Sequence, residues 1–145
     1  MPSKLDVVKA YNDTEDLNAS RAYLSDDFQS VDKDGKVVMN KEAYIGMGHM
    51  LLASLPDFRF VRSDLRQEGD YVIMTGHFQG THKADLDLSA MGLGVIPASG
   101  KEIVWPEVSV KFTVEGGKIV REEPYGELDG MKAFLMGLGV ELPSA

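Results

Sequence analysis

The spacing of the apolar residues changes near residue 58, and this change restricts the possible folds more than any other feature of the sequence. Before it, apolar side chains recur at helical spacing; after it they alternate as in strands. The predicted helices cover 3–11, 14–24, 41–54 and about 128–138, and the predicted strands form a short hairpin within 28–39 and longer runs over 58–67, 71–83, 103–114 and 118–123. This order predicts an α+β fold, in which a curved antiparallel sheet carries its helices on one face.

The length and charge of the chain restrict its partners. The 145 residues, 43% of them hydrophobic, predict a single domain over 1–145 with room for an internal pocket. Acidic residues outnumber basic residues by 23 to 15, which argues against a nucleic-acid partner. The sequence has no cysteine, no apolar run of the roughly 18 residues that a membrane span requires, and no signal-peptide pattern at its start. We therefore expect a cytoplasmic protein that binds neither nucleic acid nor membrane.

The run over 103–114 predicts a strand with two unlike faces. Alternation places Val104, Pro106, Val108, Val110, Phe112 and Val114 on one face, and Ile103, Trp105, Glu107, Ser109, Lys111 and Thr113 on the other. A strand face that meets only solvent rarely carries Ile and Trp. The second face is therefore expected to line a cavity of mixed polarity or an interface.

Four short motifs occur in an order typical of one protein family. They are GHFQGTH (76–82), ASGKEI (98–103), GGKIV (116–120) and LMGLG (135–139). Over about residues 1–140 the chain resembles the SnoaL-like polyketide cyclases, which belong to the superfamily of ketosteroid-isomerase-like and nuclear-transport-factor-like cone-shaped proteins. The resemblance implies a cystatin-like α+β barrel, in which a cone-shaped curved antiparallel sheet holds helices on its concave face and encloses a pocket.

The resemblance also implies an activity, namely an intramolecular aldol reaction without a cofactor. In that family a carboxylate near the end of the last strand removes a proton next to a carbonyl, and a histidine of the neighbouring strand lies in the same pocket. This sequence departs from the pattern at both positions. Ser109 stands where the histidine falls, near Glu107, and the segment 121–129 offers several carboxylates, none of which maps cleanly onto the family's base.

Three residues are candidates for proton transfer, because a carboxylate or histidine with a pKa near 7 can move a proton at neutral pH. Glu122 occupies the position of the family's base if no residue is inserted; otherwise it is an exposed strand carboxylate. Glu107 faces the predicted cavity, or else forms an ion pair on a solvent or dimer face. His82 matches the family's Gly-x-His and serves as an auxiliary donor, or else is a hydrogen-bonded structural histidine. The predicted ligand-binding residues are Trp105, Ser109, Tyr44, Phe28, Tyr125 and Met91.

Glycines mark two further segments. Gly46 and Gly48 lie inside the predicted helix 41–54, where each costs about 1 kcal/mol relative to Ala, and they indicate close packing of that helix on the sheet. The segment 84–100 is rich in glycine and still apolar, and Met91 lies within it. This loop is expected to fold over the open end of the cone as a lid, or to pack against a partner subunit.

These observations lead to three interpretations of the function. The first is a pocket for a small hydrophobic, carbonyl-bearing molecule, with acid–base chemistry of the cyclase or isomerase type. The second is a non-catalytic module of the same fold that binds a ligand or dimerises, and the third is a hydrolase or dehydratase that uses a pocket water. No cofactor and no metal are predicted, because His77 and His82 fall on opposite faces of one strand and cannot chelate together. A homodimer through the outer sheet face is expected, since helices cover only one side.

Overall fold

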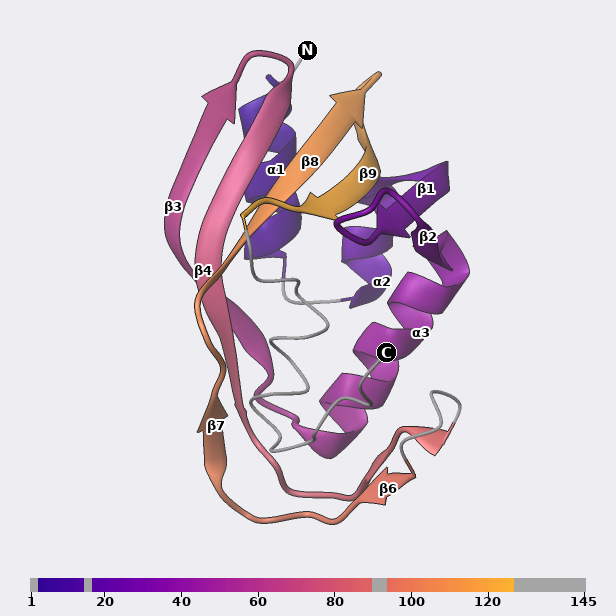
Figure 1. Ribbon diagram of the computed structural model, residues 1–145, viewed down its shortest axis with the longest axis vertical. Coiled ribbons are helices and arrows are strands. Elements are labelled where there is room, and N and C mark those ends of the chain that lie inside the picture. Colours follow the sequence, from indigo (N-terminus) through magenta and orange to yellow (C-terminus); the bar gives the residue numbers. More distant parts are fainter. Residues whose placement is uncertain (1–2, 15–16, 90–93, 127–145) are drawn as a thin grey trace.

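The computed structural model describes residues 3–14, 17–89 and 94–126, which form a curved sheet with two long helices packed against it (Figure 1). The helical elements are α1 (Lys4–Asp13), α2 (Leu17–Ser20), the 3-10 turn η1 (Arg21–Tyr23) and α3 (Lys41–Ser54). The strands are β1 (Leu24–Val31), β2 (Val37–Asn40), β3 (Arg59–Glu68), β4 (Tyr71–Thr81), β5 (Leu86–Asp87), β6 (Val95–Ile96), β7 (Glu102–Val104), β8 (Val108–Glu115) and β9 (Lys118–Pro124). Met91 and the predicted helix over 128–138 lie outside the described residues.

The strands of the main sheet follow the order β2-β1-β9-β8-β4-β3, and β7 pairs with the last residues of β4. All of these pairs are antiparallel except β1 with β9, which is parallel. The α+β prediction is confirmed, with the correction that one strand pair of the sheet is parallel. Within the described part of the chain, β5 and β6 pair only with each other and form a separate small ribbon.

The two long helices begin where the sequence supplies capping side chains. At α1 the Asp6 N–H donates to the Ser3 hydroxyl at 3.1 Å, and the Ser3 N–H donates to the Asp6 carboxylate at 3.4 Å, which forms a capping box. At α3 the Asn40 side chain accepts from the Ala43 N–H at 2.9 Å. As predicted, α3 ends just before Pro56, because a proline disfavours helical geometry in the residue that precedes it.

Two clusters of buried side chains form the core. The first lies where α1 and α3 meet the central strands, and it includes Val8, Ile45 and Phe112. The second lies at the other end of the molecule and consists of Leu51, Leu55, Leu86, Leu88 and Trp105. Helix α1 packs on β3, β4, β8 and β9, whereas α3 packs on β1, β2 and β5. None of the described helices is both long and apolar enough to cross a membrane.

The predicted continuous strand over 103–114 is wrong, because Trp105, Pro106 and Glu107 interrupt it. Between β7 and β8 the chain advances four residues, from Val104 to Val108, while the facing stretch of β4 advances only three. Because of this bulge, the even-numbered residues of β7 and those of β8 point to opposite faces of the sheet. Accordingly, Val104 is 58% exposed, whereas Val108 and Trp105 are both buried. Glu107 is exposed.

Two further predictions need correction. Among the described residues of the range 14–24, helical structure consists of the short α2 and η1. Gly46 does not mark close packing of α3, since a Cβ atom at this position would meet nothing within 4 Å. Close approaches occur instead in β4, most tightly at Gly76, where a Cβ would overlap the Val61 carbonyl oxygen of β3, and less tightly at Gly80.

Candidate functional site

Glu122 lies on β9 and faces the first core cluster. On β8 it pairs with the buried Phe112, and on β1 it pairs with Ser30. The register between β8 and β9 shifts before this point because Val120 is an extra residue in β9. As a result Ile119 and Glu122, three positions apart, both share a face with core residues of β8. The bulge therefore directs a carboxylate toward the interior.

Two tyrosines from the helices extend a hydrogen-bonded chain from this carboxylate. Tyr11 of α1 donates its hydroxyl hydrogen to the Tyr44 hydroxyl of α3 at 3.3 Å, and the Tyr44 hydroxyl is hydrogen-bonded to the Glu122 carboxyl. Aromatic neighbours hold both rings: Phe28 packs edge-on against Tyr44 at 5.0 Å between ring centroids, and Phe112 against Tyr11 at 6.3 Å. Three separate segments thus form a polar chain inside an apolar cluster.

The electrostatics of this chain favour proton transfer by Glu122. Burial raises the pKa of Glu122 to about 7, and the hydrogen bond from Tyr44 partly opposes this increase. The Oε2 atom of Glu122 is shielded from solvent and has no hydrogen-bond partner among the described residues. Burial, followed by the negative charge of Glu122, also raises the pKa of Tyr11 and that of Tyr44 above the ordinary range. Both tyrosines therefore remain protonated donors at neutral pH, whereas Glu122 can accept and release a proton.

The family profile of the SnoaL-like polyketide cyclases matches residues 5–133. The chain belongs to this family. The match covers the elements that carry Tyr11, Tyr44 and Glu122, and it confirms the resemblance inferred from the four sequence motifs. No curated protein sequence matches the chain significantly.

Solved structures share the fold of this SnoaL-like chain at low sequence identity. AclR from Streptomyces galilaeus, described as a proposed hydroxylase, gives a TM-score of 0.69 at 21% identity, over 97% of this chain and 80% of that chain. A proposed SnoaL-like polyketide cyclase from Jannaschia sp. CCS1 gives 0.69 at 16% identity, over 98% and 99%. A hypothetical protein from Catenulispora acidiphila with a ketosteroid-isomerase-like fold gives 0.62 at 16% identity, over 94% of each chain. These relatives confirm the cone-shaped α+β fold, and they establish the fold alone.

The structure does not bring His82 to Glu122. Glu122 pairs with Phe112, and Phe112 pairs with Val72 near the start of β4. His82 comes ten residues after Val72, about 30 Å further along an extended chain. Its backbone N–H donates to the Lys101 carbonyl at 3.0 Å, and its ring is buried, with no hydrogen-bond partner for Nε2 among the described residues. His82 therefore lies at the opposite end of the SnoaL-like domain, where its backbone is hydrogen-bonded to Gly100 and Lys101.

The other predicted site residues are dispersed. Tyr44 and Phe28 lie beside Glu122, whereas Trp105 belongs to the second core cluster and packs edge-on against Phe58 at 5.7 Å. Ser109 lies on the outer face of the sheet, where its hydroxyl is 2.7 Å from that of Thr75. The Tyr125 hydroxyl donates to Glu68 at 3.2 Å on the surface, and Glu107 is exposed between two strands. Among the described residues, no group of His, Asp and Glu side chains could hold a metal ion.

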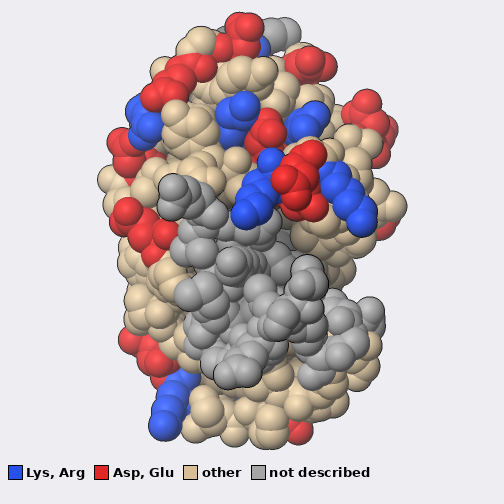
Figure 2. Space-filling view, in the orientation of Figure 1, with Lys and Arg blue, Asp and Glu red and all other residues tan. Residues whose placement is uncertain are grey.

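The outer face of β8 and β9 is polar. Figure 2 shows basic and acidic side chains side by side over this part of the surface. Glu123 lies 3.4 Å from Lys111 and 3.7 Å from Arg121, and the Lys111 ammonium lies over the ring of Tyr71 at 4.2 Å. The predicted homodimer through this face stays a prediction.

Sequence reasoning missed Tyr11, because its position in the apolar pattern of the first helix identified it only as a core residue. Its hydroxyl gains a role from Tyr44 and Glu122, which follow 33 and 111 residues later in the chain. The one signal available was a polar atom at an apolar helical position, since a buried tyrosine hydroxyl normally finds a partner.

Proposed function

We propose that this SnoaL-like protein catalyses a proton transfer on a small apolar molecule that contains a carbonyl group, with Glu122 as the general base. The observation that carries the proposal is a carboxylate with a pKa of about 7 whose Oε2 has no hydrogen-bond partner among the described residues. A general base works best when its pKa is close to the operating pH. The membership in a family of polyketide cyclases supports the same class of chemistry.

In the proposed step, Oε2 of Glu122 takes a proton from the carbon next to the carbonyl, and an enolate forms. The negative charge moves from the carboxylate to the enolate oxygen at the same time. The Tyr44 hydroxyl, which bonds to the charged carboxylate in the resting state, is then free to donate to the enolate oxygen, and Tyr11 supports it through its own hydrogen bond.

Two outcomes of the enolate balance the protons. In a cyclase reaction the enolate carbon attacks a second carbonyl carbon of the same molecule, and the oxygen of that carbonyl takes the proton back from Glu122. In an isomerase reaction Glu122 returns the proton to a different carbon. The two outcomes need the same base and no other reactant, so the reaction depends on the shape of the bound molecule.

The proposal is tested by hydrogen exchange in heavy water. A series of bicyclic ketones such as 2-tetralone is incubated with the protein, and loss of the signal of the hydrogen next to the carbonyl is followed by proton NMR. We expect exchange above the buffer rate that rises with pH and levels off above about pH 7. Glu122→Gln should lower the rate by about 100-fold or more, whereas the matched variant Glu123→Gln, which changes the neighbouring carboxylate on the outer face, should retain it.

Full exchange activity in Glu122→Gln would refute the role of this residue. Ligands that bind, as seen from shifted ketone signals, without exchange above the buffer rate would instead favour the non-catalytic binding module. This alternative remains the second interpretation because the position of the family's histidine is Ser109, which lies on the outer face.

A further inference from the structure

Ser30 of β1 is a polar residue on the inner face of the sheet, beside Glu122. The parallel register between β1 and β9 pairs Ser30 with Glu122 and Gln29 with Arg121. Gln29 is exposed, whereas Ser30 is 7% exposed and Phe28, two residues before it, is 1% exposed. Since alternate residues of a strand point to the same face, the Ser30 side chain lies on the face that carries Phe28 and Glu122.

The Ser30 hydroxyl is available to a ligand. It takes part in no hydrogen bond with another described residue, and the Glu122 carboxyl receives its hydrogen bond from Tyr44. Neighbouring strands lie roughly 4.8 Å apart, so this hydroxyl and Oε2 of Glu122, which has no partner among the described residues, belong to side chains that start from adjacent positions on one face. A hydroxyl removed from water without a partner destabilises a fold, so packing alone does not account for a serine here.

The proposed reaction needs such a donor before the proton moves. A tyrosine has a single O–H donor, and Tyr44 uses its donor on the Glu122 carboxylate while the base is charged. Tyr11 donates its own hydrogen to Tyr44. The hydrogens of both tyrosines are therefore engaged when a ketone arrives, and its carbonyl oxygen requires another donor to hold the reacting carbon next to Oε2.

We propose that the Ser30 hydroxyl donates a hydrogen bond to the carbonyl oxygen of the bound ketone and keeps this bond while that oxygen becomes the enolate oxygen. The inference rests on the proposed function, because it takes Glu122 as the base. Ser30 keeps its proton throughout, since the proton that Glu122 accepts comes from the carbon next to the carbonyl. Tyr44 is released as the carboxylate loses its charge, so the enolate oxygen has two donors where the ketone oxygen had one.

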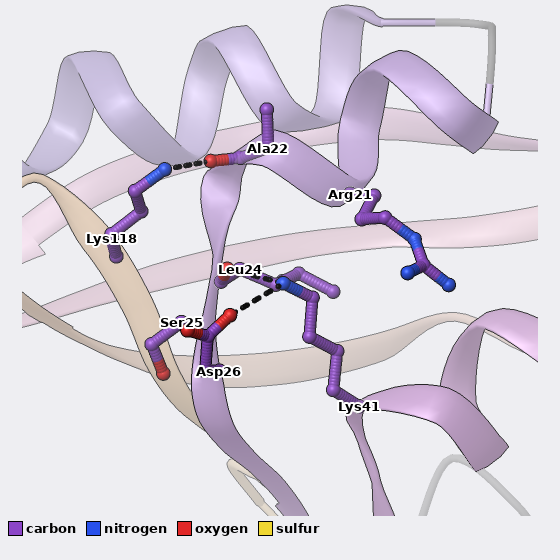
Figure 3. Close-up of a pocket in the computed structure, with 7 residues that line it drawn as sticks. All are labelled: Arg21, Ala22, Leu24, Ser25, Asp26, Lys41 and Lys118. Atoms are coloured by element: carbon purple, nitrogen blue, oxygen red, sulfur yellow. Dashed lines mark hydrogen bonds and ion pairs between the residues drawn. The ribbon is translucent and has the colours of Figure 1, made fainter.

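Ser30→Ala is compared with Ser25→Ala, the matched change at the other serine of β1. The Ser25 hydroxyl donates to Asp27 at 2.8 Å, and Ser25 lines a surface hollow together with Asp26 and Lys41 (Figure 3). In the exchange of 2-tetralone in heavy water, we expect Ser30→Ala to lower the maximal rate by about 100-fold and Ser25→Ala to retain it. The pH above which the rate levels off should stay at about 7 in both variants, since neither hydroxyl bonds to Glu122.

Infrared spectroscopy observes the proposed hydrogen bond directly and does not depend on turnover. 2-Tetralone labelled with carbon-13 at its carbonyl is bound at about pH 8.5, where Glu122 is ionised, and subtraction of the unlabelled sample isolates its carbonyl band. A hydrogen bond donated to a carbonyl lowers its stretching frequency. We expect a low frequency in the unchanged protein and in Ser25→Ala, whereas in Ser30→Ala the band should move toward its position in hexane.

Urea unfolding separates this role from a structural one. Because the Ser30 hydroxyl bonds to none of the described residues, Ser30→Ala should not lower the free energy of unfolding. A serine that only supported the fold would lower this free energy when replaced and would leave the carbonyl band of the bound ketone in place.

Four results would overturn the proposal. They are an unchanged exchange rate in Ser30→Ala, an unchanged carbonyl band, a loss of stability in this variant, and equal effects of Ser30→Ala and Ser25→Ala. Exchange that Glu122→Gln abolishes and Ser30→Ala leaves intact would overturn the role of Ser30 alone.

Failure of the proposed function gives a different result. If 2-tetralone binds without exchange above the buffer rate, Glu122 is not the base, whereas a band that moves only in Ser30→Ala still supports the contact between Ser30 and the carbonyl. The absence of binding by every ketone of the series would overturn both proposals.

Discussion

Replacing Glu122 by Gln should stabilise the protein, and the gain should grow as the pH rises. The folded state holds the Glu122 proton more tightly than the unfolded state, because burial raises the pKa of this carboxyl from 4.5 to about 7. Stability from this shift is fully present below about pH 4.5 and is lost as the pH rises through 7. Gln resembles the protonated carboxyl in shape and in its lack of charge, so the variant should not undergo this loss.

The magnitude follows from the size of the shift. Each pKa unit corresponds to about 1.4 kcal/mol, so a shift from 4.5 to about 7 is worth about 3 kcal/mol once the group is fully ionised in both states. At about pH 5.5 only the first part of this difference has developed, about 1 kcal/mol. The free energy of unfolding of Glu122→Gln, relative to the unchanged protein, should therefore rise by about 2 kcal/mol between about pH 5.5 and 8.5.

Urea unfolding of both proteins, at several pH values across this range, measures the difference directly. Glu123→Gln is the matched control, since Glu123 is the next residue on β9 and pairs with Lys111 on the outer face. Its substitution should give no gain that grows with pH. A difference between Glu122→Gln and the unchanged protein that stays constant from about pH 5.5 to 8.5 would refute the argument, because linkage then requires that the pKa of Glu122 be the same in both states.

Two further predictions concern the surroundings of Glu122 and the packing of β4. Tyr44→Phe should move the pKa of Glu122 above 7, because it removes the hydrogen bond that favours the carboxylate, and Tyr11→Phe should move this pKa less. Both shifts are measured as the pH at which the free energy of unfolding stops falling. A larger effect of Tyr11→Phe would contradict the order Tyr11–Tyr44–Glu122 in the hydrogen-bonded chain. Gly76→Ala should destabilise the protein by about 3 kcal/mol in urea unfolding, because the new Cβ would overlap a carbonyl oxygen of β3. Gly46→Ala should stabilise the protein by about 1 kcal/mol, because its Cβ meets nothing within 4 Å and Ala favours a helix. Equal effects of the two substitutions would show that β3 and β4 can move apart at position 76.

The parts of the fold that depend on local signals could be predicted from the sequence. The helices α1 and α3 lie where the helical spacing predicts helices over 3–11 and 41–54, with Ser3 and Asn40 as their caps, and a turn at Gly35 joins β1 to β2 within the predicted hairpin. The strands β3 and β4 lie where the change to alternating spacing predicts them, although Ser63 is an extra residue that shifts the register within β3. Each of these elements is specified by residues within one turn or one hairpin of it, so the sequence alone was sufficient.

Side-chain direction in the long strands could not be predicted in the same way. One extra residue between Val104 and Val108, and another at Val120, each reverse the alternation. A shift of one residue exchanges the two faces of a strand, so alternation alone could not decide between a cavity and solvent for Glu107, which is exposed. Pro106 was a signal for the first interruption, because proline cannot donate to a sheet. Nothing in the local sequence marks the second.

The stability that the protein loses when buried Glu122 ionises helps to decide whether this carboxylate serves a function or the fold. A loss of about 3 kcal/mol at high pH is a large part of the 5–15 kcal/mol that usually stabilises a domain. Gln at the same position would keep the shape, and its amide could still accept the Tyr44 hydrogen bond, so the fold alone gives no reason for a carboxylate. A base that works near neutral pH does give one, because the burial that costs stability also raises the pKa to about 7. Stability and hydrogen exchange should therefore respond to Glu122→Gln with opposite signs, whereas a carboxylate that only supported the fold would lose stability when replaced and leave the exchange rate unchanged.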